Sequence, residues 1–429
     1  MAPCTRILSA FALLLGAPLA QAGYFQWEMV ELPAATGAAC GDGSPYRFFV
    51  NRTPFSHDMA VSFEGGGACW DQKACLGEGK LGAANPNGIP VDYMQSPNVA
   101  HGLVTPFTAR NDPAQTVQTQ SWNLVFFPYC TGDVHAGSKV AVYADAYPAT
   151  PRVEYHRGQA NVSAAAQWLR ANLGQPAKLL LTGFSAGGVG ATVTYPLVRE
   201  ALQPTGNVTL LADSGPLMQA PRSGSPAQYP SLPLHNTIRA AWGLDEADGL
   251  VTRFSSGLLV GFDPNNLGSV SGALALTYPG DRFGYMLFTR DSNFSAFSYE
   301  KFYPDIANAP NQPAYLQALF SRWWPDIALW TAALDAYANV SYYVPYFRDV
   351  NDSHCLTIID FSGTGIESAG IASVAPFVDS SLDRGPPTRR VFGFDEAGRR
   401  PAVEPENAAD FTQPLSIYVR LFNLISRSP

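Results

Sequence analysis

The part of the sequence that most constrains the fold lies near the middle of the chain, at residues 179–191, LLLTGFSAGGVGA. Four residues suited to a buried strand run directly into the pentapeptide Gly-Phe-Ser-Ala-Gly, whose serine is Ser185. This arrangement is typical of a nucleophile elbow, in which a strand turns sharply into a helix and holds a serine in a strained backbone conformation. Glycines are needed two positions before and after the serine, because side chains there would collide with the turn. The sequence therefore predicts a strand, a tight turn and a helix, with the oxygen of Ser185 exposed at the end of a sheet.

The alternative is a glycine-rich turn in which the serine is incidental. A G-x-S-x-G pattern is weak on its own in a chain with 38 glycines, but the strand before it and the small residues after it are the context that an elbow requires. In an elbow, the backbone N–H of the residue after the serine, here Ala186, points to where a negatively charged oxygen develops. We therefore expect Ser185 to be a nucleophile that has its catalytic partners elsewhere in the chain.

Short β-rich runs alternate with helical or loop-rich segments along the chain, which is the pattern of an α/β fold. The length of 429 residues alone suggests two or three domains, but no internal repeat or low-complexity linker divides the sequence. We therefore expect residues 23–429 to form one catalytic domain, with a mostly parallel central sheet flanked by helices. A helix is expected at 157–173, and strands at residues 46–50, 59–63, 122–127, 178–182, 207–212, 285–289 and 342–347.

Polar residues of the catalytic type follow several predicted strands at the point where each strand ends. In open α/β sheets the ligand crevice lies outside the carboxyl ends of the strands, so we expect these residues to converge. They are Glu64 with glycines 65–67, Asp133, Ser185, Asp213, Asp291 and the loop 349–354.

The longer connections differ in composition. Segment 216–280 is rich in proline, glycine and apolar residues, and we interpret it as a cap insertion over the active site. Segment 304–335 contains three tryptophans and is expected to be helical, with its aromatic side chains in the core. Segment 376–400 is expected to be an exposed connection, and segment 415–424 a final helix.

The base that activates a serine is usually a histidine that a carboxylate orients. Where an elbow of this kind carries a triad, the chain order is serine, acid, histidine, which leaves His235 and His354 as the two histidines after Ser185. His235 lies in the predicted cap among apolar residues, where a structural or substrate-lining role is expected. His354 follows the last predicted strand in a loop that suits a mobile, partly exposed imidazole, so we assign the base to His354.

The acid of the triad is expected to be Asp291 or Asp213, because both follow strands that come after the elbow strand. Asp213 precedes Ser-Gly, which suits a tight turn that its carboxylate caps. Asp291 has no such structural task. We therefore prefer Asp291 and keep Asp213 as the alternative acid.

Three consecutive glycines, residues 65–67, follow the second predicted strand. Glycines allow the backbone to approach a substrate closely and to aim amide hydrogens at a developing oxyanion. The alternatives are a plain glycine turn and a phosphate-binding loop. A phosphate loop requires a following Lys-Ser/Thr and a helix that starts at the glycines, and neither is present.

The first 22 residues read as a signal peptide. Arg6 precedes an apolar run at 7–15, and Ala20-Gln21-Ala22 is an A-x-A cleavage site. The apolar run is too short to span a bilayer, which takes about 20 residues. Cleavage changes the net charge of −8 by one unit, to −9, since Arg6 is the one charge removed. We therefore expect a secreted or periplasmic protein that starts near Gly23 and that does not bind nucleic acid or membranes.

Five cysteines follow the predicted cleavage site, and an exported protein can oxidise them. Cys69 and Cys75 are close enough for a small-loop disulfide. Because the number is odd, at least one thiol stays free or pairs outside the chain. The spacings do not match a zinc site, so we expect no metal. The cysteines are Cys40, Cys69, Cys75, Cys130 and Cys355.

Taken together, several stretches resemble the pectin acetylesterase/Notum family of serine carboxylesterases, which have the α/β-hydrolase fold. The combination is far more specific than the elbow alone. The stretches are residues 40–45 (CGDGSP), 63–70 (FEGGGACW), 128–137 (PYCTGDVHAG), 183–191 (GFSAGGVGA) and 211–215 (LADSG), with the loop around His354.

The resemblance implies a role for individual residues. By motif, Ser185 is the nucleophile, Asp291 the acid and His354 the base. The oxyanion amides come from Gly66, Gly67 and Ala186. The family pattern pairs Cys40 with Cys130 and Cys69 with Cys75, and leaves Cys355 free.

These observations predict an exported, monomeric esterase that needs no cofactor and cleaves O-acetyl esters, for example on a polysaccharide. One alternative is a lipase or polyester depolymerase, because the aromatic, apolar cap suits longer acyl or polymeric esters. A different class is an inactive, secreted carbohydrate-binding relative, against which the intact serine, histidine and glycine loop argue.

Overall fold

The computed structural model describes residues 23–79, 81–95, 105–110, 116–348 and 351–391. The predicted signal peptide at 1–22 and the predicted final helix at 415–424 lie outside the described residues.

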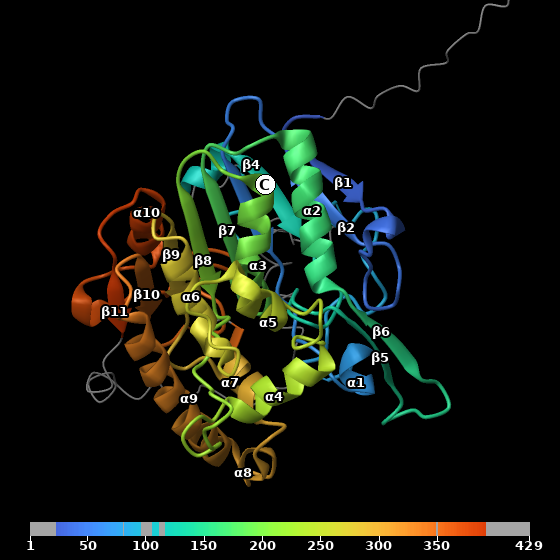
Figure 1. The fold of residues 1–429 in the computed structure, drawn as a ribbon. Coiled ribbons are helices and arrows are strands. Elements are labelled where there is room, and N and C mark those ends of the chain that lie inside the picture. Colours follow the sequence, from blue (N-terminus) through green and yellow to red (C-terminus); the bar gives the residue numbers. More distant parts are fainter. Residues whose placement is uncertain (1–22, 80, 96–104, 111–115, 349–350, 392–429) are drawn as a thin grey trace, which may run out of the picture.

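A nine-stranded sheet forms the centre of the molecule, in the order β1-β2-β4-β3-β7-β8-β9-β10-β11 (Figure 1). β2 runs antiparallel to its neighbours β1 and β4, and the other neighbouring strands are parallel. This is the mixed α/β architecture that the sequence predicts. The strands are β1 (Trp27–Glu31), β2 (Arg47–Asn51), β3 (Met59–Phe63), β4 (Asn123–Phe127), β7 (Leu179–Phe184), β8 (Val208–Asp213), β9 (Arg282–Met286), β10 (Val340–Val344) and β11 (Arg389–Val391).

Both faces of the central strands are covered, because successive side chains of a strand point to opposite faces. Leu179 and Leu181 of β7 pack in the core under α2 (Gly158–Leu173) and α3 (Ala186–Leu202). Leu180 between them belongs to a second core under α10 (Ala375–Leu382). Strands buried on both faces read as continuous apolar runs rather than alternating ones.

The sequence locates five strands of the central sheet closely, places two later along the chain than observed, and does not predict β1 or β11. The predicted strands for β2, β3, β4, β7 and β8 end within two residues of the observed ones. The predictions at 285–289 and 342–347 lie later along the chain than β9 and β10. Leu287 N–H still donates to Tyr343 O and Thr289 N–H to Pro345 O, so the two segments run side by side beyond the formal strand ends.

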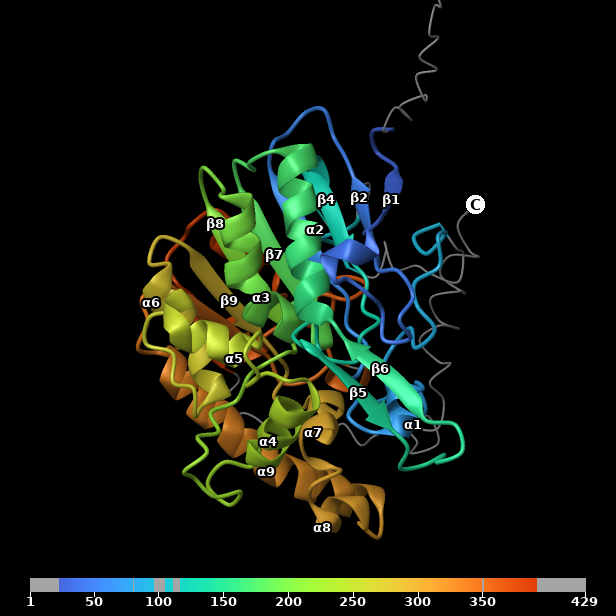
Figure 2. The same ribbon diagram turned by 45° about the vertical axis from the view of Figure 1, so that its right-hand side comes forward.

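Most of the remaining helices lie beyond the carboxyl ends of the parallel strands (Figures 1 and 2). Segment 216–280 forms α4 (Leu232–Ala241), α5 (Leu250–Arg253) and α6 (Val270–Thr277). The connection from β9 to β10 forms α7 (Ser292–Tyr299), α8 (Pro304–Ala307) and α9 (Gln312–Leu334), as the helical prediction for 304–335 requires. No helix in the described part of the chain combines the length and apolar character needed to cross a bilayer.

One prediction about a connection needs correction, and one hairpin is not predicted at all. The described part of segment 376–400 is not simply an exposed connection, because Phe377, Val378 and Leu382 of α10 are buried against the sheet; residues 392–400 lie outside the described residues. An antiparallel hairpin of β5 (Lys139–Tyr143) and β6 (Arg152–His156) also projects from the body beside the short helix α1 (Gln72–Cys75), as Figure 2 shows.

Candidate active site

Ser185 occupies the turn between β7 and α3. Its backbone has φ 57° and ψ −126°, a conformation that residues other than glycine rarely adopt. The Ser185 N–H donates to Asp213 O at 2.8 Å, and its carbonyl accepts from Gly188 N–H at 2.9 Å. The strand, the turn and the helix therefore fix a strained serine, as expected for an elbow.

The glycines around the serine are required by close contacts of the backbone. A side-chain carbon on Gly183 would lie 2.3 Å from Gly187 O, and one on Gly187 would lie 2.1 Å from Phe63 O. Both distances are far below van der Waals contact. The elbow turn therefore fits against the end of β3 only because these two positions lack side chains.

The glycine loop after β3 lies directly against the elbow. A side-chain carbon on Gly65 would lie 2.9 Å from Ser185 Cβ, and Gly66 and Gly67 have φ of 136° and 62°. In the part of the chain that the structure describes, no protein acceptor receives a hydrogen bond from the N–H groups of Gly66, Gly67 or Ala186. These amides are therefore candidates for binding a developing oxyanion.

Glu64 anchors the start of this loop. Its buried carboxylate accepts from Tyr93 Oη–H at 2.6 Å and from Tyr129 N–H at 2.8 Å. Its carbonyl lies 3.0 Å from His135 Nε2, which must donate because a carbonyl only accepts. Burial lowers the pKa of His135 to about 4, so the ring is neutral. The sequence places Glu64 at a strand end but does not reveal this anchoring role.

His354 and Asp291 form a direct pair. His354 Nδ1 lies 2.8 Å from Asp291 Oδ2, and both side chains are buried. The other oxygen of Asp291 caps α7 by accepting from Asn293 N–H at 3.1 Å and Phe294 N–H at 2.8 Å. Asp291 is thereby fixed by the helix it precedes and orients the imidazole, so the expectation that it has no structural task is wrong.

The environment of His354 is less exposed than the sequence suggests. The residue is only 4% exposed. The ring of Phe294 stacks on the imidazole, with 6.3 Å between the two ring centroids. Burial disfavours the charged imidazole, but the charge and hydrogen bond of Asp291 outweigh it, so the pKa of His354 is raised above its ordinary value. The expectation of a partly exposed imidazole is therefore wrong.

The carboxylate of Asp213, the alternative acid, accepts hydrogen bonds from residues other than His354. Its Oδ1 accepts from Leu356 N–H at 2.9 Å, and its Oδ2 accepts from the N–H and the hydroxyl of Thr357, both at 2.7 Å. Burial raises the pKa of Asp213, and these hydrogen bonds oppose that effect. The carboxylate thus binds the segment that follows His354, whereas the imidazole itself binds Asp291.

The serine and the histidine loop meet on the end of β8. Asp213 O accepts from Ser185 N–H, and the adjacent Ser214 Oγ accepts from Cys355 N–H at 2.9 Å. The structure therefore brings Ser185, the glycine loop and the His354–Asp291 pair to one edge of the sheet.

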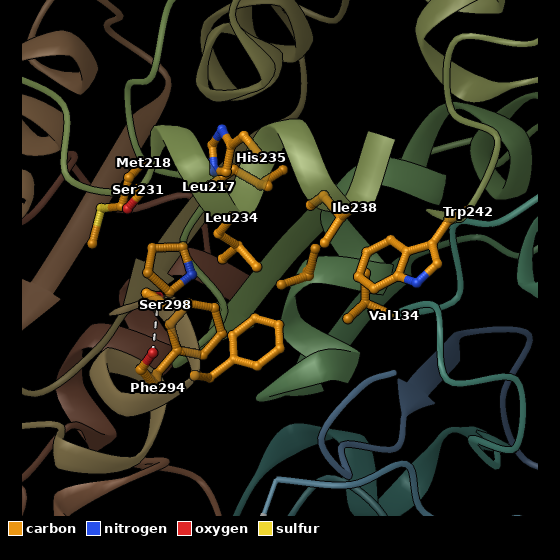
Figure 3. A pocket seen from close by; sticks show the side chains of 13 residues that line it. Val134, Leu217, Met218, Ser231, Leu234, His235, Ile238, Trp242, Phe294 and Ser298 are labelled. Atoms are coloured by element: carbon orange, nitrogen blue, oxygen red, sulfur yellow. Dashed lines mark hydrogen bonds between the residues drawn. The ribbon is translucent and has the colours of Figure 1, made fainter. Parts of the chain in front are cut away.

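Figure 3 shows an apolar pocket that is lined not by the candidate catalytic residues themselves but by residues that neighbour them. Its walls include Val189 of α3, Pro216 after β8, and Phe294 of α7, the residue that stacks on His354. It offers about 20 Å³ of room for the centre of a water-sized sphere, and an adjoining apolar pocket offers about 30 Å³. Each has space for roughly one or two waters.

His235 contributes to the wall of the same pocket from α4 (Figure 3). Burial, with the nearby charge of Arg239, lowers the pKa of His235 to about 3. Its Nδ1 is buried and has no hydrogen-bond partner among the described residues. His235 is a neutral, structural or pocket-lining histidine, and no carboxylate of the described ranges is hydrogen-bonded to it.

The cysteines pair as the family pattern implies. Disulfides join Cys40 to Cys130 and Cys69 to Cys75, and Cys355 is a buried free thiol. Among the described residues, the ligand atoms of Cys69, Cys75 and His156 lie within 4.8 Å of one another. The two sulfurs form the disulfide, so they do not offer the thiolates that a zinc site uses.

The fold and the site define an enzyme-like α/β-hydrolase architecture, and a solved structure shares it. The Wnt deacylase Notum from Drosophila aligns with 85% of this chain and 96% of its own, with a TM-score of 0.52 and 18% sequence identity. At that identity the likeness concerns the fold.

The family follows from the sequence comparisons. The pectinacetylesterase family matches residues 19–234, half of the sequence, and the chain belongs to that family. This confirms the resemblance drawn from the motifs.

Palmitoleoyl-protein carboxylesterase NOTUM of Mus musculus is 27% identical over 186 residues, 42% of this chain and 34% of the relative. Pectin acetylesterase 5 of Arabidopsis thaliana is 27% identical over 190 residues, 43% of this chain and 40% of the relative. The matched part thus spans about a third to two-fifths of these relatives.

Proposed function

We propose that the protein is a serine carboxylesterase with Ser185 as nucleophile, His354 as base and Asp291 as acid. The observation that carries the proposal is the 2.8 Å contact between His354 Nδ1 and Asp291 Oδ2, at the sheet edge where the elbow holds Ser185. With Nδ1–H donated to the carboxylate, Nε2 keeps a lone pair that can accept the proton of the serine hydroxyl.

The reaction then proceeds in two halves. Ser185 Oγ attacks the ester carbonyl while His354 takes its proton, and the protonated imidazole returns that proton to the departing alcohol. Water, activated by the same histidine, attacks the acyl-enzyme and releases the acid. The N–H groups of Gly66, Gly67 and Ala186 stabilise the oxyanion in both halves, each for about 3 kcal/mol. The reaction needs no metal or organic cofactor.

The acyl group that the site favours is small, most simply acetyl on a polysaccharide. The support is the pocket lined by Phe294, the residue that stacks on His354, because it has apolar walls and space for only roughly one or two waters. A relative is named pectin acetylesterase. In this proposal segment 216–280 acts as the cap that closes over the acyl group.

A longer or polymeric acyl group, as in a lipase or polyester depolymerase, is the second candidate. The two adjoining pockets share Val134, Val189, Leu217, Ile238 and Trp242, so movement of α4 would join them into one apolar channel. Other relatives are named palmitoleoyl-protein carboxylesterases. The third possibility, an inactive carbohydrate-binding relative, leaves the strained serine and the oriented imidazole without a purpose.

The two disulfides are typical of an oxidising compartment. They support our proposal that the protein acts after export, as a monomer, on an ester substrate rather than on nucleic acid or membranes.

A fluorophosphonate probe tests the proposal directly. We expect it to label Ser185 in the wild type and not in Ser185→Ala, and the variant to lose hydrolysis of p-nitrophenyl acetate. An unlabelled wild type, under conditions that label a known esterase, would contradict the serine mechanism.

The acyl preference needs a separate comparison. We expect p-nitrophenyl acetate to have a higher kcat/KM than the octanoate, and acetate to be released from acetylated polysaccharides. Preference for the octanoate, or release of hydroxy acids from polyesters, would favour the second candidate.

A further inference from the structure

The loop that carries His354 contains an unusual amount of unfavourable backbone. Positive φ angles occur at residues that are not glycine, where the side chain opposes them. A loop of this kind keeps its shape only when other contacts hold it. The residues are Asn351 (51°), Asp352 (56°), Ser353 (55°), Cys355 (71°) and Ile359 (67°).

The carboxylate of Asp213 supplies contacts on one side of the loop. It is fully buried, and both of its oxygens accept hydrogen bonds from Leu356 and Thr357. The hydroxyl of Ser214 donates to Asp213 Oδ1 at 3.0 Å and accepts from Cys355 N–H, which extends the same network to the residue next to His354.

The guanidinium of Arg348 holds the loop from the other side. Its Nη1 donates to the carbonyls of Leu356 and Ile358, both at 3.3 Å, and its Nη2 to the Asp360 carboxylate at 3.0 Å. The N–H of Leu356 therefore donates to Asp213, and its carbonyl accepts from Arg348. A buried carboxylate and a buried guanidinium clamp the backbone between them.

Asp213 also contacts the nucleophile turn, because its carbonyl accepts from Ser185 N–H at 2.8 Å. One residue is thus joined through its backbone to the serine and through its side chain to the loop of the histidine. We propose that Asp213 is a positioning residue that sets the separation of Ser185 and His354 without exchanging a proton with either. The proposal rests on the esterase function proposed above.

The physical reason is that proton transfer from a hydroxyl to an imidazole needs the two groups within hydrogen-bond reach. A displacement of about 1 Å can lower the rate about 100-fold. If the amides of Leu356 and Thr357 lose their acceptors, the loop can relax its positive φ angles, and His354 shifts relative to Ser185. Its bond to Asp291 is made on α7 and does not depend on Asp213.

The test compares two buried aspartates. In Asp213→Asn the amide group keeps the shape of the side chain but turns an N–H₂ toward backbone N–H donors. We expect kcat for p-nitrophenyl acetate, per folded molecule, to fall about 10–100-fold, with KM within about twofold. Loss of the Asp213 charge should move the acidic limb of the pH profile to lower pH, but by less than in Asp291→Asn, because Asp291 contributes more than Asp213 to the raised pKa of His354.

Asp281→Asn is the matched control. Asp281 is also buried and accepts from Tyr195 Oη–H and Arg199 Nε–H, both at 2.9 Å. It precedes the amino end of β9, whereas the candidate site lies at the carboxyl ends of the strands. We expect Asp281→Asn to lower the melting temperature as Asp213→Asn does, and to leave kcat per folded molecule within about twofold. Equal kcat losses in the two variants would reduce Asp213 to a purely structural role and overturn the proposal.

Thr357→Val provides a gentler variant, in case Asp213→Asn does not fold. It removes one hydroxyl donor to Asp213 and keeps the backbone N–H, and we expect kcat to fall a few-fold with KM unchanged. If Ser185→Ala abolishes activity while Asp213→Asn and Thr357→Val retain wild-type kcat, the positioning role fails and the esterase stands. If the wild type hydrolyses no ester, both proposals fail.

Discussion

The elbow around Ser185 and the loop around His354 both contain strained backbone, yet different contacts hold them. The elbow is held by contacts of the main chain, which glycines at 183 and 187 make possible. The loop of His354 has no glycine at its strained residues, and side chains distant in sequence, Asp213 and Arg348, hold it. The first kind of strain can be recognised in a pentapeptide, whereas the second depends on residues far apart in the chain.

The largest expected effect is the loss of kcat in Asp291→Asn, which should greatly exceed the loss in Asp213→Asn. Asp291→Asn removes the charge that orients His354 and stabilises its protonated form, and we expect kcat to fall about 10⁴-fold. This is at least a hundred times the loss expected for Asp213→Asn. Steady-state hydrolysis of p-nitrophenyl acetate by the two purified variants measures the ratio. If Asp291→Asn turned over normally and Asp213→Asn did not, the acid would be Asp213.

The elbow is the region where one added methyl group has the greatest effect on folding. In Gly187→Ala the new carbon would lie 2.1 Å from Phe63 O, and we expect a loss of at least about 3 kcal/mol in the free energy of unfolding. Gly280→Ala is the control, because a carbon there meets nothing within 4 Å and should change stability by less than about 1 kcal/mol. Urea unfolding followed by circular dichroism compares them. Equal stabilities would mean that the elbow can shift to make room.

The loop of His354 should respond to loss of a side chain rather than to an added one. Arg348→Met leaves the buried carbonyl of Leu356 without a donor and removes one of two donors to the carbonyl of Ile358, and we expect about 2 kcal/mol of destabilisation. Hydrogen exchange should accelerate at the amides of residues 355–357 and stay slow in α3. Uniform acceleration in both regions would show that the loop and the elbow open as one unit.

The smallest effect concerns pH. Protonated His354 cannot accept the serine proton, so kcat/KM should fall as pH decreases through the raised pKa of His354, with a midpoint above 6.5. Because the folded pKa exceeds the unfolded one, the pair stabilises the fold fully below the unfolded pKa and loses that contribution as pH rises through the folded pKa. In Asp291→Asn the midpoint should move down. A midpoint below 6.5 in the wild type would mean that burial outweighs Asp291.

The parts of this protein that could be predicted from sequence are those that local chemistry determines. Apolar runs give β3, β4, β7 and β8 nearly to the residue, and the elbow and the glycine loop follow from glycines at fixed spacing. The His354–Asp291 pair was predicted from chain order and motif resemblance, and the structure places the two side chains in contact.

The remainder depends on contacts between distant residues. In the β5–β6 hairpin the valines at 140, 142 and 153 are exposed while Glu154 and His156 are buried, so the usual pattern of apolar residues inside and polar residues outside does not mark it as sheet. Glu64 and Arg348 read as ordinary charged residues beside strands. The side-chain partners of Glu64 include residues 21, 29 and 65 positions away, and those of Arg348 lie 8 to 12 positions away. Asp213 suggests a turn cap from its Ser-Gly neighbours, and Ser214 does donate to it, but its partners Leu356 and Thr357 lie more than 140 residues later.

Cys355 gives this loop an internal reporter. It is the free thiol in the described part of the chain, it is 1% exposed, and it directly follows His354. Burial raises the pKa of the thiol, which further slows its reaction with alkylating reagents in the closed state. The rate at which a maleimide modifies the Cys355 thiol in native protein therefore measures how often the histidine loop opens, without any engineered label.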